Sequence, residues 1–236
     1  MATLNDGSYV ETPVTWDVTA EELAQYLQTK GKYTIWGTTQ YGKLCELTLW
    51  ILNPNLASAG SFESDEGVTG YGSTDNFIQS SGELGGWQTS HVGGTALQLY
   101  TSNDSGNARM GSQSFHFWDS SALNFKLYQT IDLSKLSEYG AGKYTLNFDI
   151  MGGDGVDMDI HAYVKITYND GTAALTKDGN SVELKGWLEW QTTTVSVDIA
   201  DLSKVASVEI GISVVCGVTG GGPWGNIDNC QFYFED

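Results

Sequence analysis

The stretch that decides the fold is Thr145-Leu146-Asn147-Phe148-Asp149-Ile150-Met151, in which side chains alternate between two kinds. Leu146, Phe148 and Ile150 would face one way, and the residues between them would face the other. A period of two is the signature of a β-strand with one face against a core. Residues 161–168 and 208–215 repeat the pattern. We therefore expect strands that each keep one face in water.

Outward from this stretch, residues 53–236 open with a polar, Gly- and Ser-rich part up to about residue 94 and then continue as short strands separated by turns. The candidate strands cover residues 96–101, 114–118, 125–131, 143–151, 160–168, 182–184, 190–199, 207–215 and 230–234. Asp-Gly pairs at 170–171 and 178–179, and another at 6–7, are typical of hairpin turns. The pattern predicts an all-β fold, a two-sheet antiparallel β-sandwich of the jelly-roll type.

The first 52 residues have a different organisation. Thr19 is a candidate N-cap for a helix over residues 20–27, and strands are expected near residues 10–16, 33–38 and 44–52. Asn53-Pro54-Asn55 then breaks the strand pattern, because proline cannot continue a central strand. We predict a small module at 1–52 and a larger one at 53–236.

Charge and composition exclude several functions. The chain has 11 Lys and Arg against 29 Asp and Glu, a net charge of −18, and 40% hydrophobic residues. Such a surface repels nucleic acid and anionic lipid, and no apolar run is long enough for membrane insertion. The first residues lack the basic and apolar parts of a signal peptide, so we expect an excised piece of a longer protein.

The three cysteines, Cys45, Cys216 and Cys230, cannot all pair with one another. Cys216 and Cys230 flank a Gly-rich loop between two apolar runs. They either form a disulfide or remain free thiols, and the sequence leaves both open.

Several separated motifs resemble one family. They are Gly60-Ser61-Phe62-Glu63, Phe115-His116-Phe117-Trp118, Tyr128-Gln129-Thr130-Ile131-Asp132-Leu133, Gly142-Lys143-Tyr144-Thr145-Leu146, Gly186-Trp187 and Trp224-Gly225-Asn226-Ile227-Asp228-Asn229. Over residues 53–236 this set resembles the β-sandwich carbohydrate-binding modules, most of all family 61, the galactan-binding module found beside endo-β-1,4-galactanases. The resemblance implies a non-catalytic module that binds β-1,4-galactan, is secreted by a bacterium and is tethered to a catalytic domain.

Residues 1–52 separately resemble the last part of a bacterial Ig-like domain. The shared motifs are Asp6-Gly7-Ser8, Val14-Thr15-Trp16-Asp17 and Gly31-Lys32-Tyr33-Thr34-Ile35-Trp36-Gly37. The opening strands of that family are missing. Trp16, Trp36 and Trp50 are expected in the core of this partial module or at its junction with the larger one.

Tryptophan suits a sugar ligand, because the C–H groups of a pyranose stack on the electron-rich face of an indole. If Phe115 and Phe117 fill the core, His116 and Trp118 share the opposite face and are our first choice of ligand residues. The other candidate ligand residues are Trp187, Trp224, Asp149, His161, Tyr163 and Arg109. Packing is the alternative for each. Trp224 is expected to project from the glycine loop before it, and Arg109 to grip neighbouring hydroxyls.

In modules of this kind the acid of G-x-F-E and the Asp of I-D-N bring the chain ends together around a structural calcium ion. The resemblance assigns these roles to Glu63 and Asp228. Calcium prefers such oxygen ligands. The alternative is that both acids make ordinary hydrogen bonds in turns.

Two other function classes stay open at this point. An enzyme acting on glycosides needs two carboxylates at a set separation, and nothing singles out such a pair among 29 acidic residues. A structural spacer would account for the first module but not for aromatic residues on wet strand faces. Other ligands such as xylan, β-glucan or mannan are alternatives to galactan.

Overall fold

The computed structural model describes residues 2–3, 9–27, 31–51, 54–70 and 77–235, and the chain forms two compact units, 1–54 and 55–236. Residues 52 and 53, where we predict the boundary, lie outside the described residues. Within the described ranges, no helix is long and apolar enough to cross a membrane.

The first unit is a three-stranded antiparallel sheet with one helix. The sheet has the order β3 (Val14–Trp16), β4 (Gly31–Thr39) and β5 (Leu44–Ile51), and strands β1 (Ala2–Thr3) and β2 (Tyr9–Val10) form a separate pair. The predicted turn at 5–8 lies outside the described residues. The predicted helix is present as α1 (Ala20–Tyr26). Thr19 and Glu22 form a capping box, in which each side chain accepts the other's backbone N–H.

This unit buries little. Ile35 is 4% exposed, but Trp16 and Trp36 are 38% and 50% exposed. The expectation that these two indoles form its core is therefore wrong, and the side chain of Trp50 lies outside the described residues.

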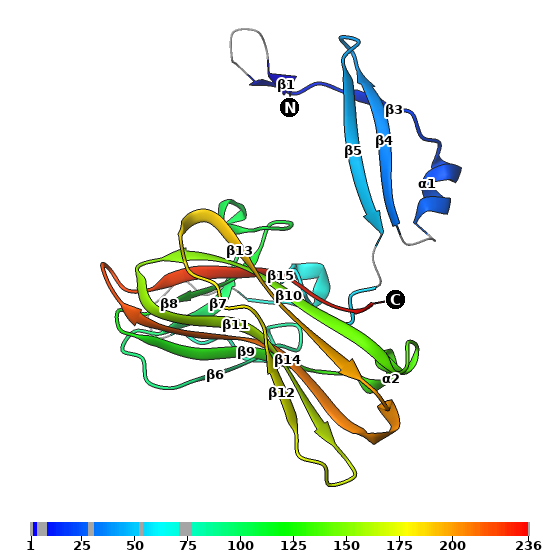
Figure 1. The fold of residues 1–236 in the computed structure, drawn as a ribbon. Coiled ribbons are helices and arrows are strands. Elements are labelled where there is room, and N and C mark those ends of the chain that lie inside the picture. Colours follow the sequence, from blue (N-terminus) through cyan, green and yellow to red (C-terminus); the bar gives the residue numbers. More distant parts are fainter. Residues whose placement is uncertain (1, 4–8, 28–30, 52–53, 71–76, 236) are drawn as a thin grey trace. The chain divides into compact units, whose positions relative to one another are not determined.

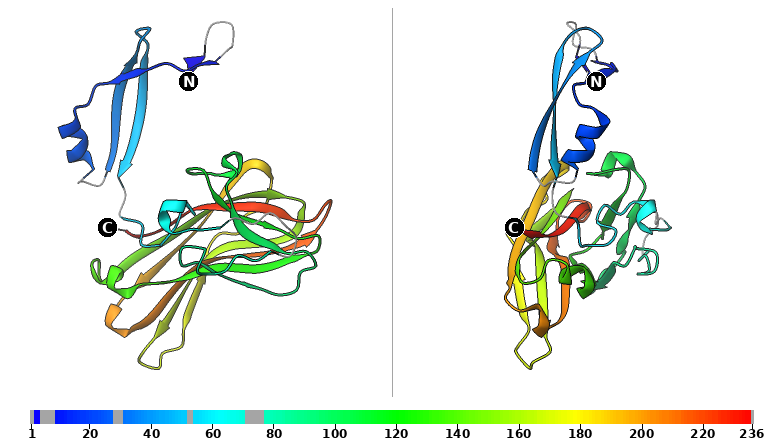
Figure 2. Two further views of the ribbon diagram at one scale, coloured as in Figure 1. Left: turned by 180° about the vertical axis from the view of Figure 1, so that it is seen from behind. Right: turned by 90° about the vertical axis from the view of Figure 1, so that its right-hand side faces the viewer.

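The second unit confirms the predicted all-β antiparallel sandwich (Figure 1). One five-stranded sheet has the order β13 (Gly186–Ile199), β10 (Gly142–Gly153), β15 (Trp224–Glu235), β8 (Ser114–Trp118) and β7 (Gln98–Ser102). The other has the order β12 (Leu175–Asp178), β11 (Gly155–Tyr168), β14 (Val205–Val218), β9 (Leu123–Ile131) and β6 (Gln88–His91). Short helices α2 (Leu133–Ser137), η1 (Ser64–Glu66), η2 (Ser105–Asn107) and η3 (Leu202–Lys204) lie in the connections. The strand layers can be followed from two further directions in Figure 2.

The core lies between the two sheets and follows the period-two pattern. Leu146, Phe148 and Ile150 of β10 are completely buried, as predicted, and Phe115 and Phe117 of β8 join them. Burial of apolar area on this scale is the main favourable term in folding. The side chains of β10 that we predict to face the core therefore do face it.

Two local expectations are wrong. The Asp-Gly pair at 178–179 is not a hairpin turn, because β12 pairs with β11, and the chain after it crosses to the other sheet. Gly179 is needed for space: a Cβ there would lie 2.4 Å from the carbonyl oxygen of Thr194. The predicted strand at 182–184 is only an isolated bridge at Val182.

The polar, Gly- and Ser-rich part before residue 94 contributes to the core. Phe62, Leu84 and Trp87 are fully buried, and the Trp87 indole N–H donates to the carbonyl oxygen of Ala59 at 3.0 Å. This part also contains strand β6, which the sequence pattern does not reveal. This mainly polar part is therefore held to the core by a few large apolar side chains.

The outer face of the β10 sheet is not open to water throughout. Met151 and Asp228 are completely buried, and Asn226 is 2% exposed, although all three lie away from the sandwich core. Asp228 is covered by residues 103–113, between β7 and β8, because the backbone N–H groups of Arg109 and Met110 donate to its carboxylate. Met151 is contacted instead by the backbone N–H of Leu188. The expectation of one wet face per strand is therefore wrong for β10 and β15.

Cys216 and Cys230 are both buried and free. They belong to β14 and β15, strands of different sheets. The disulfide alternative is therefore excluded in this structure.

Candidate functional site

A bulge in edge strand β13 presents an indole to solvent. Ile150 pairs with Gln191 and Gly152 pairs with Gly186, so the single residue Met151 lies opposite four residues, 187–190. The extra length pushes this segment, which we call the Trp187 bulge, out of the sheet, and Trp187 is 61% exposed. Such bulges re-aim side chains and are common beside functional sites.

The backbone of the Trp187 bulge is strained. Leu188 has a φ of 63°, a left-handed conformation that non-glycine residues seldom adopt. Its N–H donates to the sulfur of Met151 at 3.1 Å, and its own side chain is 49% exposed. Strain of this kind concentrates at ligand-binding sites.

The Trp187 ring is fixed in orientation by the loop that covers the sheet. Its indole N–H donates to Oδ1 of Asn107 at 2.9 Å. Asn107 ends η2 within the segment 103–113. The indole therefore offers its faces to a ligand without having to be ordered first, which lowers the entropic cost of binding.

Two carboxylates hold the segment 109–113 in place. Asp228 Oδ2 accepts the backbone N–H groups of Arg109 at 2.7 Å and Met110 at 2.9 Å. Glu63 Oε1 accepts those of Ser112 at 2.7 Å and Gln113 at 2.8 Å. Acids from the beginning and the end of the unit thus fix the loop that carries Arg109.

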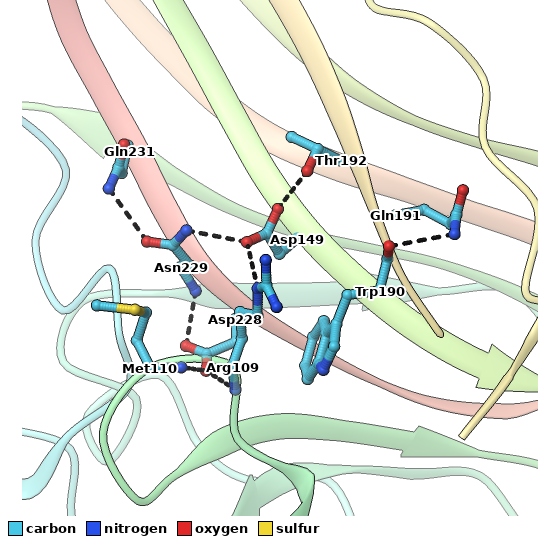
Figure 3. Close-up of polar contacts among 9 residues, drawn as sticks. All are labelled: Arg109, Met110, Asp149, Trp190, Gln191, Thr192, Asp228, Asn229 and Gln231. Atoms are coloured by element: carbon cyan, nitrogen blue, oxygen red, sulfur yellow. Dashed lines mark hydrogen bonds and ion pairs between the residues drawn. The ribbon is translucent and has the colours of Figure 1, made fainter. Parts of the chain in front are cut away.

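Asp149 lies at the centre of a polar network on the outer face (Figure 3). Its Oδ2 lies 3.4 Å from Nε of Arg109 and accepts a hydrogen bond from Nδ2 of Asn229 at 2.9 Å. Its Oδ1 accepts from the Thr192 hydroxyl at 2.6 Å. The Arg109 side chain is 51% exposed and that of Asp149 only 8%, so the guanidinium faces solvent from a fixed position.

A second bulge aims Asn229 at this network. Gln231 pairs with Asn147 and Asp228 with Asp149, so Asn229 and Cys230 both lie opposite Phe148. Asn229 has a φ of 51°, which asparagine tolerates better than most residues. The bulge turns its amide toward Asp149 and lets its Oδ1 accept from Gln231 Nε2 at 3.1 Å.

Trp190 adds a second aromatic group. It is partly exposed, and Figure 3 shows its indole directed toward the loop that carries Arg109. Gln191 fixes the turn behind it by donating from Nε2 to the carbonyl oxygens of Glu189 and Trp190. Both indoles of the bulge therefore lie by the same loop, Trp190 directed toward the part that carries Arg109 and Trp187 hydrogen-bonded to Asn107.

Burial, with a small contribution from the nearby charge of Glu63, raises the pKa of Asp228 to about 7, although three backbone N–H donors lower it. The pKa of His116 is lowered, chiefly by burial, while its hydrogen bond with Asn226 opposes that shift. Burial on the outer face under the loop therefore disfavours the charged forms of Asp228 and His116.

The hydrogen bonds of Glu63 and Asp228 bear on the predicted calcium site. Both oxygens of Asp228 and Oε1 of Glu63 accept backbone N–H groups, and Oε2 of Glu63 accepts the Ser112 hydroxyl. Donors turned toward these oxygens do not suit a cation, which needs their lone pairs. No cluster of three acidic, histidine or cysteine side chains suited to a metal occurs in the described ranges. The calcium site stays a prediction.

The structure places the other predicted ligand residues in two groups. His116 and Trp118 do share the outer face of β8, and both are partly exposed. The His116 ring lies 4.9 Å from that of Tyr100, and Trp118 pairs across strands with Trp224. Trp224 does not project from its glycine loop: it begins β15, and its ring lies over Gly153, where a Cβ would be 3.2 Å away.

His161 and Tyr163 lie on β11, in the other sheet, and cannot share a site with Asp149. Tyr163 is 3% exposed and donates its hydroxyl hydrogen bond to Glu209. His161 lies between Asp159, at 2.8 Å, and Asp178, at 3.6 Å. His161 and Tyr163 therefore lie apart from the other candidate ligand residues.

Asp149, Arg109 and Trp187 are therefore the predicted residues that the structure brings together. Sequence reasoning missed Asn107, Trp190, Thr192, Asn229 and Gln231. One signal was available, since Trp190 stands three residues after Trp187. The contacts of the others depend on cross-strand register and on two bulges, which no local pattern encodes.

No protein-family model matches this chain, and no curated protein matches it either. Among solved structures, TmCBM61 in complex with β-1,4-galactotriose is 22% identical with a TM-score of 0.47; the match covers 77% of this chain and 99% of that one. The CBM22-1 xylan-binding domain of Paenibacillus barcinonensis Xyn10C is 13% identical with a TM-score of 0.46, over 78% of this chain and 96% of that one.

The enzymatically active domain of tailspike protein 4 of bacteriophage CBA120 is 15% identical with a TM-score of 0.49, over 77% of this chain but 21% of that one. At these identities and scores we take no function from the comparisons. Carbohydrate-binding modules are among the structures that the sandwich resembles, and no comparison supports the Ig-like resemblance of residues 1–52, which stays a prediction.

Proposed function

We propose that the second unit is a non-catalytic carbohydrate-binding module whose site is formed by the Trp187 bulge and the Arg109–Asp149 pair. The observation that carries this proposal is the Trp187 indole, 61% exposed yet held by its hydrogen bond to Asn107. A large apolar ring fixed in water gains by meeting an apolar surface.

In the proposed complex, a pyranose ring stacks on Trp187 or Trp190 through its C–H groups. Its hydroxyls exchange hydrogen bonds with the Arg109 guanidinium, which donates, and with the neighbouring polar side chains of the outer face. The network around Asp149 holds Arg109 in place before the sugar arrives. Binding of this kind is largely pre-formed, as is usual for small-molecule sites.

The charge of the chain favours a neutral ligand. A net charge of −18 repels anionic polymers and leaves neutral polysaccharides unaffected. We propose β-1,4-galactan as the ligand, on the strength of the sequence motifs, with xylan, β-glucan and mannan as alternatives. We further propose that the module belongs to a secreted bacterial protein in which it raises the local concentration of substrate for a tethered glycoside hydrolase.

The geometry does not favour glycoside hydrolysis at this site. Asp149 and Asp228 are neighbours in register, but Asp228 is completely buried and its oxygens accept backbone N–H groups. A general acid must reach the glycosidic oxygen of a substrate. The pair is therefore better suited to holding the loop than to catalysis.

The test is isothermal titration calorimetry of the full chain against galactan, xylan, mannan and β-glucan. We expect heat of binding with one of them, and its loss in Trp187→Ala. Trp36→Ala is the matched control, because that indole is also exposed but lies in the first unit. Absence of heat with every glycan would overturn the proposal. Release of reducing sugar on prolonged incubation would show instead that the protein is an enzyme.

A further inference from the structure

A cleft of about 460 Å³ begins where the Trp187 bulge ends. Gln191 and Thr192 of β13 form one wall, and residues 180–183 and 185, together with Met158 of β11, form the rest. Its volume lies in the range of small-ligand sites. Thr192 is shared with the site already described, because its hydroxyl donates to Asp149.

The wall formed within residues 180–185 is fixed to the sandwich. Asn180 Nδ2 donates to the carbonyl oxygen of Thr192 at 3.2 Å, and Asn180 Oδ1 accepts the N–H of Thr194 at 2.7 Å. Farther along, Val182 forms a bridge with Ile160, and the N–H of Leu184 donates to the sulfur of Met158 at 3.1 Å. The cleft is therefore present before any ligand binds.

Polar side chains of this wall are available to a ligand. Ser181, Glu183 and Lys185 are exposed, line the cleft and make no hydrogen bond or ion pair with any residue in the described part of the chain. They provide a hydroxyl, an acceptor and a donor, the set that vicinal sugar hydroxyls require. Opposite charges side by side also suit a neutral ligand better than an ionic one.

Position links this cleft to the Trp187 bulge. Thr192 follows Trp190, the last residue of the Trp187 bulge, by two residues along β13. A polymer that stacks on the bulge and crosses Thr192 arrives at the mouth of the cleft. The aromatic groups and the cleft are thus parts of one path around the edge of the sheet.

We propose that this cleft is an extension subsite that binds the next residues of a neutral pyranose chain, with Glu183 and Lys185 as the side chains that contact its hydroxyls. The proposal rests on the proposed function of the Trp187 bulge. It predicts that the module prefers long chains over short ones. The preference comes from hydrogen bonds in the cleft, whereas the Trp187 bulge serves all lengths.

The experiment measures the affinity of the full chain for β-1,4-linked galactose and xylose oligosaccharides, from disaccharide to hexasaccharide. The variant is Glu183→Ala with Lys185→Ala, which leaves the net charge unchanged. The control is Lys165→Ala with Asp198→Ala, an equally neutral change at two exposed residues outside the cleft. We expect the cleft variant to lose roughly tenfold in affinity for the hexasaccharide and less than about twofold for the disaccharide.

The outcomes separate the two proposals. Equal affinities of wild type and cleft variant for the hexasaccharide, with Trp187→Ala still weakened, would overturn the extension subsite and leave the module intact. Equal weakening of all lengths by the cleft variant would also overturn it, since the cleft would then belong to the first subsite. Failure of the wild type to bind any oligosaccharide of either series, together with absence of heat with mannan and β-glucan, would overturn the proposed function itself.

Discussion

Nε of Arg109 lies 3.4 Å from Oδ2 of Asp149, and this pair joins the loop over the sheet to its central strands. The guanidinium is half exposed and the carboxylate is buried. Because Asp149 also accepts from Thr192 and Asn229, the pair connects strands β13, β10 and β15 with the loop that holds Trp187.

Asp149→Ala should lower both stability and affinity. It removes the acceptor for Thr192 and Asn229 and the partner of Arg109, and these donors are all at least partly exposed, so each lost hydrogen bond costs about 0.5–1.5 kcal/mol. We expect the free energy of unfolding to fall by about 1–3 kcal/mol in urea titrations. Asp149→Asn keeps an accepting oxygen and should lose less. Equal stability of the wild type and the alanine variant would contradict the structure.

Trp187→Ala should separate binding from folding. The indole is 61% exposed, so its removal should shift the melting temperature by less than about 2 °C. Glycan affinity should fall at least about tenfold, as for an aromatic hot spot. Calorimetry and thermal melts of the same samples provide the measurement.

Trp118→Ala tests one of the two residues that the sequence analysis places first among the ligand-binding candidates. Trp118 is partly buried and pairs with Trp224, so its removal should lower the melting temperature by more than Trp187→Ala does. A loss of affinity in Trp118→Ala with the fold intact would extend the binding face across β8. Unchanged affinity would confine the site to the Trp187 bulge.

Asp228 should make stability depend on pH. Burial raises the pKa of its carboxyl from an ordinary 3.8 to about 7 in the folded state, so the folded chain binds more protons between these values. The free energy of unfolding should therefore fall as pH rises from about 4 to about 7, relative to Asp228→Asn, which has no proton to lose. Comparison with the variant cancels the opposite contribution of His116, whose pKa is lowered. Parallel profiles for the two proteins would show that Asp228 does not titrate in this range.

The calcium prediction has its own test. If Glu63 and Asp228 bind the ion, calcium should raise the melting temperature at about pH 8, and a chelator should lower it, with little change in glycan affinity. Glu63→Gln should abolish the calcium effect. If a chelated sample stays folded but loses all glycan affinity, calcium does not have a purely structural role. If the melting temperature does not respond to calcium, Glu63 and Asp228 hold the segment 109–113 by hydrogen bonds alone.

The thiols should differ in reactivity. Burial raises the pKa of Cys216 to about 11 and that of Cys230 as well, so neither forms a thiolate readily. Only Cys45, which is partly exposed, should react with a thiol reagent in the native protein. All three should react after unfolding, and a reductant should not change the melting temperature. A melting temperature that falls in reductant would indicate a disulfide.

How much of this protein follows from local sequence can be seen in β10. Its inner side chains, Leu146, Phe148 and Ile150, alternate as the sequence predicts, because burial of apolar groups at period two needs no knowledge of distant residues. The same reasoning finds α1 with its Thr19 cap and the separation into two sheets. It fails on the outer side of β10, where Asp149 is buried beside Arg109 of a distant loop and Met151 is buried beside Leu188 of the Trp187 bulge.

The amino-acid sequence by itself determined the all-β class, the inward side of the strands and the candidacy of Arg109, Asp149 and Trp187. Only the tertiary structure decided that these three belong together, that His161 and Tyr163 lie on the other sheet, and that Asn229 and Thr192 complete the network. The physical reason is that sheet order, register and bulges are set by contacts between residues far apart in the chain. A period of two gives the face of a strand but neither its neighbours nor what covers it.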